Sequence, residues 1–146
     1  MKRQVLEIWR YGREIGRDSS MVIAGGGNVS VKIGKELWVK ASGFSMGSMG
    51  PEGMLCLDLD KVLSVLRGPL PPGERAERDE YVIKALLEAR IDPPSPEIRP
   101  STEAMLHAVL PYRFIAHTHP ELVMSLTSSK AGKKALSRLR LPPHLW

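Results

Sequence analysis

The fold class is decided by the stretch Val29-Ser30-Val31-Lys32-Ile33-Gly34-Lys35-Glu36-Leu37-Trp38-Val39-Lys40-Ala41. Apolar and polar residues alternate over residues 29–33, as they do in a half-buried strand. Gly34-Lys35 is a two-residue connection of the kind that closes a hairpin, so residues 36–41 are expected to return as the partner strand. Because parallel neighbours need a long crossover, this stretch argues against a purely parallel sheet.

Helical and extended patterns surround this hairpin. Helices are expected over residues 3–18, from Asp58 or Asp60 to about Arg67, over residues 75–90, from Ser101 to Leu110, and from Pro120 onward. Strands are expected over residues 54–57 and 113–119, and the proline-rich segment 91–100 is expected to be extended. This order predicts an α/β fold with a central, mostly antiparallel sheet flanked by helices.

The composition is that of an ordinary soluble globular domain. The 146 residues are 42% hydrophobic and 25% charged. Charges or glycines interrupt every apolar run before the length of about 18 residues that a membrane span needs. The single cysteine, Cys56, excludes an intramolecular disulfide framework and fits a reducing compartment. The expected location is the cytoplasm, with no membrane partner.

The net charge of +5 comes from the C-terminal end of the chain. Residues 130–146 hold five basic side chains and no acidic one, whereas the preceding residues hold 16 of each sign. Such a run is typical of a solvated helix face, and it also fits an anionic surface or nucleic acid. Nucleic acid is the weaker interpretation, because no aromatic side chains that stack on bases are interleaved with these charges.

The candidate metal ligands are the two histidines of His117-Thr118-His119. On a strand, residues two apart face the same side with Cα atoms ~6.6 Å apart. Two imidazoles in that arrangement can reach one zinc ion at about 2.0–2.1 Å. The alternative is a pair of unrelated histidines, one of them bonded within the core.

Glu103 is the candidate general base. It follows Pro100-Ser101-Thr102 at an expected helix start, where a carboxylate is often a capping group. Ser101 and Thr102 already supply hydroxyls for capping, which frees Glu103 to point toward the end of the histidine strand. A carboxylate beside a metal that binds carbonyl or alkoxide oxygens can act as a general base.

Three short segments are candidates for binding a phosphate group. Gly26-Gly27-Asn28 and Ser42-Gly43 offer backbone N–H groups with little side chain in the way. Ser101-Thr102 adds two hydroxyls at a helix start. Glycines in turns are more often required by φ angles than by a ligand. With the metal pair and the carboxylate, the three segments indicate a site for a phosphorylated carbonyl compound.

The sequence resembles the class II aldolase/adducin family in four motifs that occur in the family's order. They are Gly27-Asn28-Val29-Ser30, Lys40-Ala41-Ser42-Gly43, Pro100-Ser101-Thr102-Glu103-Ala104-Met105-Leu106-His107 and His117-Thr118-His119-Pro120. Within the family, the sequence is most similar to zinc-dependent fuculose-phosphate and rhamnulose-phosphate aldolases. The resemblance runs from about Val5 to about Gly132 and implies a three-layer domain.

The resemblance also implies a reaction and a role for each motif. The activity would be reversible cleavage of a ketose 1-phosphate into dihydroxyacetone phosphate and an aldehyde, with Glu103 as the acid/base and His117 and His119 as two of three zinc ligands. The positions implied for the substrate phosphate are Gly27, Asn28, Ser42, Gly43, Ser101 and Thr102. A sugar-phosphate dehydratase or epimerase of the same family, or a non-catalytic adducin-like binding and assembly module, is the alternative.

The sequence departs from the family pattern at its C-terminal side. The family's third zinc histidine lies on a later strand, which this sequence does not contain. His144 does not resemble that ligand, and His107 is interpreted as a structural histidine with a hydrogen-bond partner. We therefore expect residues 1–132 to form an aldolase-like domain that is incomplete at its C-terminal side, and residues 133–146 to form a basic, proline-containing tail. A homo-oligomer is also expected.

Overall fold

A four-stranded antiparallel sheet lies at the centre of the computed structural model, which describes residues 1–69, 71–91 and 98–138. The strands are β1 (Asn28–Ile33), β2 (Glu36–Lys40), β3 (Met54–Asp58) and β4 (Phe114–His117), in the order β3-β2-β1-β4. The β1–β2 hairpin turns at Gly34, whose φ of +61° suits a residue without a Cβ. The predicted hairpin and antiparallel sheet are confirmed.

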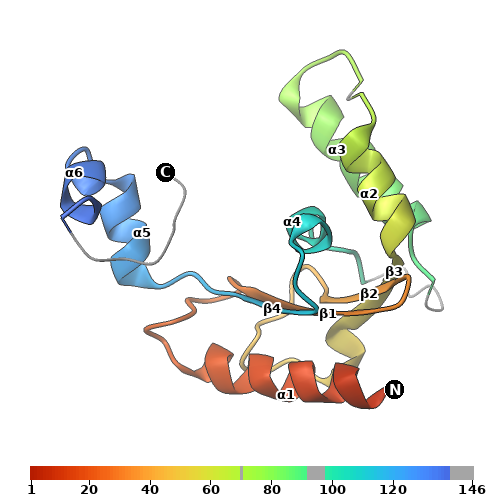
Figure 1. Ribbon diagram of the computed structural model, residues 1–146, viewed down its shortest axis with the longest axis horizontal. Helices are drawn as coiled ribbons and strands as arrows, with labels where there is room; N and C mark the ends of the chain where they lie inside the picture. Colours follow the sequence, from red (N-terminus) through yellow and green to blue (C-terminus); the bar gives the residue numbers. More distant parts are fainter. Residues whose placement is uncertain (70, 92–97, 139–146) are drawn as a thin grey trace.

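Helices cover both faces of this sheet (Figure 1). The helices of the described residues are α1 (Arg3–Arg17), α2 (Leu59–Arg67), α3 (Arg75–Glu88), α4 (Ala104–Val109), α5 (Glu121–Ser128) and α6 (Gly132–Leu136), with a short 3₁₀ turn at Pro51–Gly53; the first four cover the sheet. Helix α1 runs along one face, and α4 lies over the other, beside the α2–α3 pair. The three-layer α/β arrangement predicted from the sequence is confirmed.

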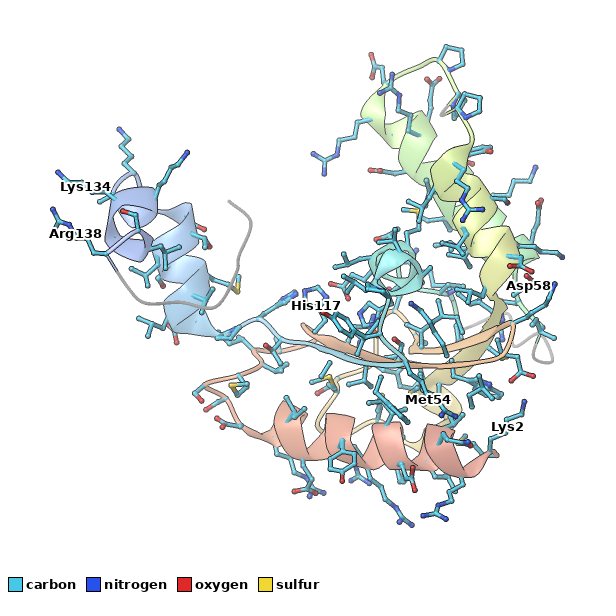
Figure 2. The ribbon with its side chains drawn as sticks, in the orientation of Figure 1. Lys2, Met54, Asp58, His117, Lys134 and Arg138 are labelled. Carbon is cyan, nitrogen blue, oxygen red and sulfur yellow. The ribbon has the colours of Figure 1, made fainter. Side chains whose placement is uncertain are left out.

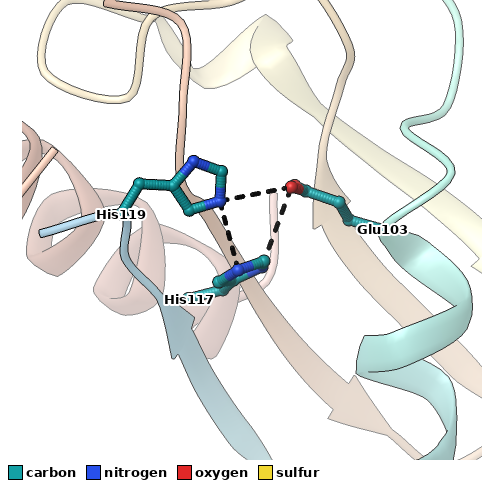
Figure 3. A group of neighbouring side chains, drawn as sticks. All are labelled: Glu103, His117 and His119. Atoms are coloured by element: carbon teal, nitrogen blue, oxygen red, sulfur yellow. Dashed lines mark hydrogen bonds and ion pairs between the residues drawn. The ribbon is translucent and has the colours of Figure 1, made fainter. Parts of the chain in front are cut away.

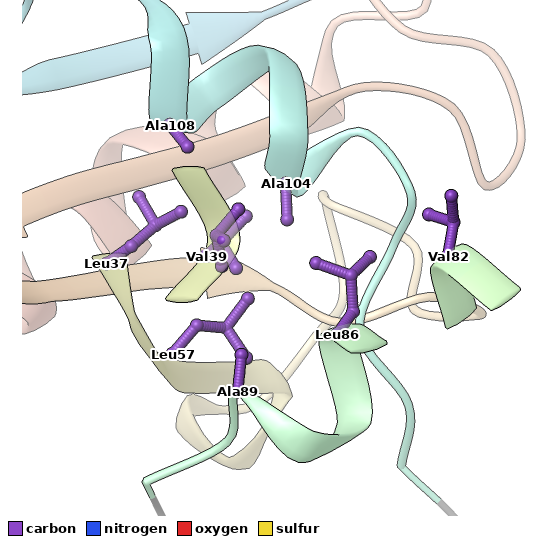
Figure 4. Packing of buried hydrophobic residues seen from close by; sticks show 9 residues of the cluster. Leu37, Val39, Leu57, Val82, Leu86, Ala89, Ala104 and Ala108 are labelled. Carbon is purple, nitrogen blue, oxygen red and sulfur yellow. The ribbon is translucent and has the colours of Figure 1, made fainter. Parts of the chain in front are cut away.

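Two apolar clusters hold the layers together. The first packs the sheet against α1 and includes Val5, Ile8, Val22, Val29, Val31, Met46, Met49 and Met54. The second packs the sheet against α2, α3 and α4 and includes Leu37, Val39, Leu57, Val62, Val82, Leu86, Ala89, Ala104 and Ala108 (Figure 4). Strand β1 contributes valines to the first cluster, and its alternate residues Asn28 and Ser30 face α4 and are fully buried.

Three sequence-based expectations are corrected by the structure. Strand β4 ends at His117 rather than at His119. Helix α4 begins at Ala104 with Glu103 at the N-cap position, so Ser101 lies before the helix rather than at its N-cap, and its Oγ accepts a hydrogen bond of 3.3 Å from the N–H of Glu103. Strand β1 is covered on both faces rather than half-buried, because α4 lies over its polar side.

The C-terminal helices lie apart from the sheet. Helices α5 and α6 pack against each other beyond the end of β4, and α5 buries none of its residues. The basic side chains of Lys134 and Arg138 project from this part of the chain (Figure 2).

Among the described residues, no helix is long and apolar enough to cross a membrane. Most of the predicted extended segment 91–100, and residues 139–146 of the predicted tail, lie outside the described residues.

Asp58 provides the cap that starts α2. Its Oδ1 accepts a hydrogen bond of 3.0 Å from the backbone N–H of Lys61. We expect Asp58→Ala to lower the free energy of unfolding by about 1 kcal/mol, the usual contribution of an N-cap side chain, in a urea titration. Asp58→Ser keeps an oxygen that can cap and should lose much less. Equal losses in the two variants would show that the cap is not the stabilising contact.

Candidate metal and acid/base site

Two histidines meet where β4 ends. The Nε2 atoms of His117 and His119 lie 3.2 Å apart. His119 lies beyond the strand and is held by its backbone N–H, which donates a hydrogen bond of 3.0 Å to the carbonyl oxygen of Met21. A Cβ at Gly26 would lie 2.9 Å from Nδ1 of His119, so the glycine-rich turn leaves room for this imidazole. The pair therefore comes from the end of β4 and from the connection between β4 and α5, not from one strand.

Glu103 faces both imidazoles from the start of α4 (Figure 3). Its Oε1 lies 3.6 Å from Nε2 of His119 and 3.8 Å from Nδ1 of His117. Its Oε2 accepts a hydrogen bond of 3.0 Å from Nδ2 of Asn28. The side chain makes no capping hydrogen bond to the helix, although it occupies the N-cap position. The carboxylate is thus directed at the histidines and held there from β1.

The three side chains form a donor set that fits a zinc ion. Ligand atoms of Glu103, His117 and His119 all lie within 4.8 Å of one another. Two nitrogens bound at about 2.0–2.1 Å to a tetrahedral zinc ion lie about 3.3 Å apart, close to the 3.2 Å between the histidine Nε2 atoms. All three side chains are about a quarter to a third exposed, so the site is reachable from solvent.

The structure brings two of the candidate phosphate segments together. Ala41 and Pro100 form an isolated antiparallel bridge, and the N–H of Ser42 donates to the carbonyl oxygen of Arg99 at 2.9 Å. Ser42-Gly43 therefore lies next to Ser101-Thr102. Ser42 is partly exposed, whereas Gly43 and Thr102 are exposed, so these segments are open to a ligand.

The third candidate phosphate segment has a different environment. Asn28 is fully buried, and its amide is already bonded to Glu103. Gly27 has a φ of +74°, and a Cβ at this position would lie 3.0 Å from the carbonyl oxygen of His117. Gly27 and Asn28 thus allow β1, β4 and Glu103 to approach closely, and phosphate binding by these two residues stays a prediction.

Lys40 is a buried cation whose role the sequence patterns do not indicate. It is 2% exposed, and its Nζ donates to the carbonyl oxygens of Phe44 at 2.8 Å and Ala41 at 3.3 Å. Burial lowers the pKa of Lys40, and the nearby carboxylate of Glu103 acts in the opposite direction. These bonds fix the loop that carries Ser42 and Gly43. An isolated lysine at the end of a predicted strand gives no sign of this contact.

His107 is bonded inside the protein, as its helical position suggested. It is fully buried, and its Nδ1 lies 2.7 Å from Oγ of Ser30. Burial, and to a smaller extent the neighbouring His117, lowers the pKa of His107 to about 4. The imidazole is therefore neutral at physiological pH. Its spacing of four residues from Glu103 on a helix is the sequence signal that places both on one face.

Comparison with known proteins identifies the family. Residues 6–141 match the family model described as Class II Aldolase and Adducin N-terminal domain. The match covers most of the chain and contains all of the candidate site residues. The chain belongs to this family.

Three individual proteins are similar to this chain. The uncharacterized oxidoreductase YuxG from Bacillus subtilis (strain 168) is 34% identical over 143 residues, which cover 92% of this chain and 20% of that protein. The N-terminal class II aldolase domain of a conserved protein from Thermoplasma acidophilum superposes with a TM-score of 0.76 and 27% identity, over 94% of this chain and 65% of that chain. The L-fuculose-1-phosphate aldolase from Thermus thermophilus has a TM-score of 0.48 and 20% identity, over 87% of this chain and 51% of that chain. The chain thus spans about a fifth of its curated relative.

Proposed function

We propose that this chain carries the metal and acid/base site of a sugar-phosphate lyase, which cleaves a ketose 1-phosphate to dihydroxyacetone phosphate and an aldehyde. The observation that carries the proposal is the convergence of Glu103, His117 and His119 within 4.8 Å at a solvent-accessible position. Membership of the class II aldolase and adducin family supports this interpretation. The oxidoreductase name of the Bacillus relative describes a protein of which this chain matches 20%, so it assigns no activity to this chain.

His117 and His119 would hold the zinc ion through their Nε2 atoms. Zinc supplies Lewis-acid polarisation of a substrate carbonyl when it is bound. Oε1 of Glu103 is the free oxygen of a carboxylate whose other oxygen is bonded to Asn28, so it is available to move a proton on the carbon next to that carbonyl. Asn28 thereby sets the orientation of the carboxylate. The start of helix α4 carries Glu103 and strand β1 carries Asn28, and these two residues lie on the same side of the sheet.

Ser42-Gly43 and Ser101-Thr102 are the segments that we assign to the substrate phosphate. They are adjacent through the Ala41–Pro100 bridge, and Ser101-Thr102 directly precedes Glu103 in the chain. Gly43 has a φ of +84°, and no atom lies within 4 Å of the position of a Cβ there, which leaves an open approach to the backbone. Hydroxyl and backbone N–H donors of this kind suit a phosphate.

The activity test compares phosphorylated and unphosphorylated ketoses with zinc-loaded protein, and dihydroxyacetone phosphate is measured as the product. Ser42→Ala should raise KM for the ketose 1-phosphate by about tenfold or more, the scale of one hydrogen bond to a charged group, with little change for the unphosphorylated ketose. Ser48→Ala, in the same loop, is the control. Equal losses on both substrates would remove Ser42 from the phosphate site. If zinc-loaded protein releases no dihydroxyacetone phosphate from any ketose 1-phosphate, the lyase proposal fails.

A further inference from the structure

A short chain of buried polar groups lies beneath the metal and acid/base site. Ser30 on β1 and His107 on α4 are both fully buried and bonded to each other at 2.7 Å. The next ring is that of His117, whose centroid lies 5.9 Å from that of His107 with the planes tilted by 43°. This separation is within the range of contacting rings, about 4.5–7 Å. The three side chains therefore run in order from the core to the candidate zinc ligand.

Two nitrogens of the Ser30–His107–His117 row are buried without a hydrogen-bond partner. Within the described part of the protein, the buried side-chain nitrogen and oxygen atoms without a partner are Arg13 Nε, Asn28 Oδ1, His107 Nε2 and His117 Nδ1. The last two belong to the neighbouring rings. A buried polar atom without a partner is costly, so the occurrence of two in adjacent imidazoles needs a reason.

The hydrogen-bonding capacity of the two rings is complementary. A neutral imidazole has one N–H and one lone pair. If Nδ1–H of His107 donates to Ser30, Nε2 of His107 is an acceptor. A histidine that binds a metal through Nε2 carries its proton on Nδ1 and usually donates it to a second group that fixes the ring. His117 needs such an acceptor, and His107 offers one.

We propose that His107 is a positioning residue for the metal site. The ring separation of 5.9 Å leaves the two nitrogens beyond direct hydrogen-bond distance, and a small approach of the rings lets Nε2 of His107 accept the Nδ1–H of His117, which keeps the Nε2 lone pair of His117 directed toward His119. The proposal rests on the proposed metal-binding function. It adds Ser30 and His107 to the site, neither of which would touch the metal or the substrate. In the metal-free protein, Nε2–H of His119 then donates to Nε2 of His117 across the observed 3.2 Å.

Glu103 is the competing acceptor for the same proton. Its Oε1 lies 3.8 Å from Nδ1 of His117, which is longer than a hydrogen bond, and 3.6 Å from Nε2 of His119. His107 and Glu103 can be replaced separately. The variant that changes the tautomer of His117 then identifies which of the two residues accepts its Nδ1 proton.

The first test reads the tautomer of His117 in metal-free, 15N-labelled protein by long-range 1H–15N NMR. In the wild type, His117 should carry its proton on Nδ1. His107→Met, which has a similar volume and no nitrogen, should give a mixture of tautomers, whereas Glu103→Gln should leave His117 unchanged. The reverse pattern would assign the role to Glu103 and overturn the proposal. An unchanged tautomer in both variants would also overturn it.

The second test measures zinc affinity by competition with a chelator. His107→Met should weaken zinc binding by about 10–100-fold, the usual effect of removing the partner of a metal-bound histidine. His107→Gln, which keeps a hydrogen-bonding group, should recover part of the loss. Ile115→Val, a conservative change in the core beneath β4, is the control and should retain wild-type affinity. Wild-type affinity in His107→Met would overturn the proposal.

A third variant covers the case in which a replaced His107 does not fold. Ser30→Ala keeps the imidazole and removes only its partner, so it should shift the tautomer and the zinc affinity in the same direction by a smaller factor. An unchanged Ser30→Ala protein would then overturn the proposal. If the wild type binds no zinc, the proposed function fails, but the tautomer of His117 still tests the contact with His107.

Discussion

Glu103→Gln is expected to lower turnover by about 10²–10⁴-fold, the usual contribution of a positioned general base. The amide has nearly the same shape as the carboxylate, and its oxygen can still accept the hydrogen bond from Nδ2 of Asn28. It cannot take up a proton at neutral pH. Helix α4 should stay intact because the Glu103 side chain makes no capping bond, and the bond from the N–H of His107 goes to the backbone carbonyl of Glu103.

Three measurements on Glu103→Gln separate its possible roles. The free energy of unfolding should change by less than roughly 1 kcal/mol, the scale of one capping interaction, and the zinc content should not change. Glu121→Gln, at the exposed start of α5, is the matched control. Unchanged turnover would exclude Glu103 as the acid/base. Loss of zinc would make it a required metal ligand instead, which its distances of 3.6 and 3.8 Å to the histidines allow.

The antiparallel fold could be predicted because its signal is local. The alternation over residues 29–33 and the two-residue connection Gly34-Lys35 specify the β1–β2 hairpin without reference to any distant residue. The end of β4 could not be predicted in this way. Asn28, the first residue of β1, pairs with His117, and the chain turns away at Gly27 with a φ of +74°. The ladder has no partner beyond His117, so β4 stops there.

The start of α4 has a similar long-range cause. Ser101 has the residue type and position of an N-cap, yet the helix begins three residues later. The Ala41–Pro100 bridge and the bond from Ser42 to Arg99 hold this segment against the end of β2. The backbone at Pro100 is therefore extended, residues 102–103 form a turn closed by the bond from the N–H of Ala104 to the carbonyl oxygen of Ser101, and the α-helix follows from Ala104. A capping pattern read from the sequence does not include this contact.

Ser30 on the polar face of β1 is the part of the site that the sequence pattern does not indicate. A polar residue at alternate positions of a half-buried strand normally faces solvent, and the alternation over residues 29–33 predicts that environment for Ser30, whereas Asn28 is predicted to bind phosphate from the preceding turn. In the structure both are fully buried under α4, where they bond to Glu103 and His107. Periodicity identifies a polar face but cannot distinguish water from a buried polar site. A solvent-facing and a buried polar face can be told apart only once the position of the covering helix, α4, is known.

His117→Ala is expected to remove zinc from the purified protein, with an affinity loss of more than about 100-fold. Loss of a partner in the outer shell of a metal site already costs about 10–100-fold, and this change removes a direct nitrogen ligand. The side chain of His117 is 26% exposed and lies at the end of β4, so its truncation should leave the two apolar clusters intact. His119→Ala should lose zinc in the same way, because the site needs both Nε2 atoms.

Metal analysis after dialysis, followed by a zinc titration, measures this effect. Thr118→Ala lies between the two histidines and is the matched control, which should retain one zinc ion per chain. Circular dichroism should show that all three variants keep the wild-type fold. A His117→Ala protein that retains stoichiometric zinc would place the metal elsewhere and refute the site. A folded wild type that binds no zinc would instead support the non-catalytic alternative, in which the family fold serves binding or assembly, because Glu103 then has no metal to act beside.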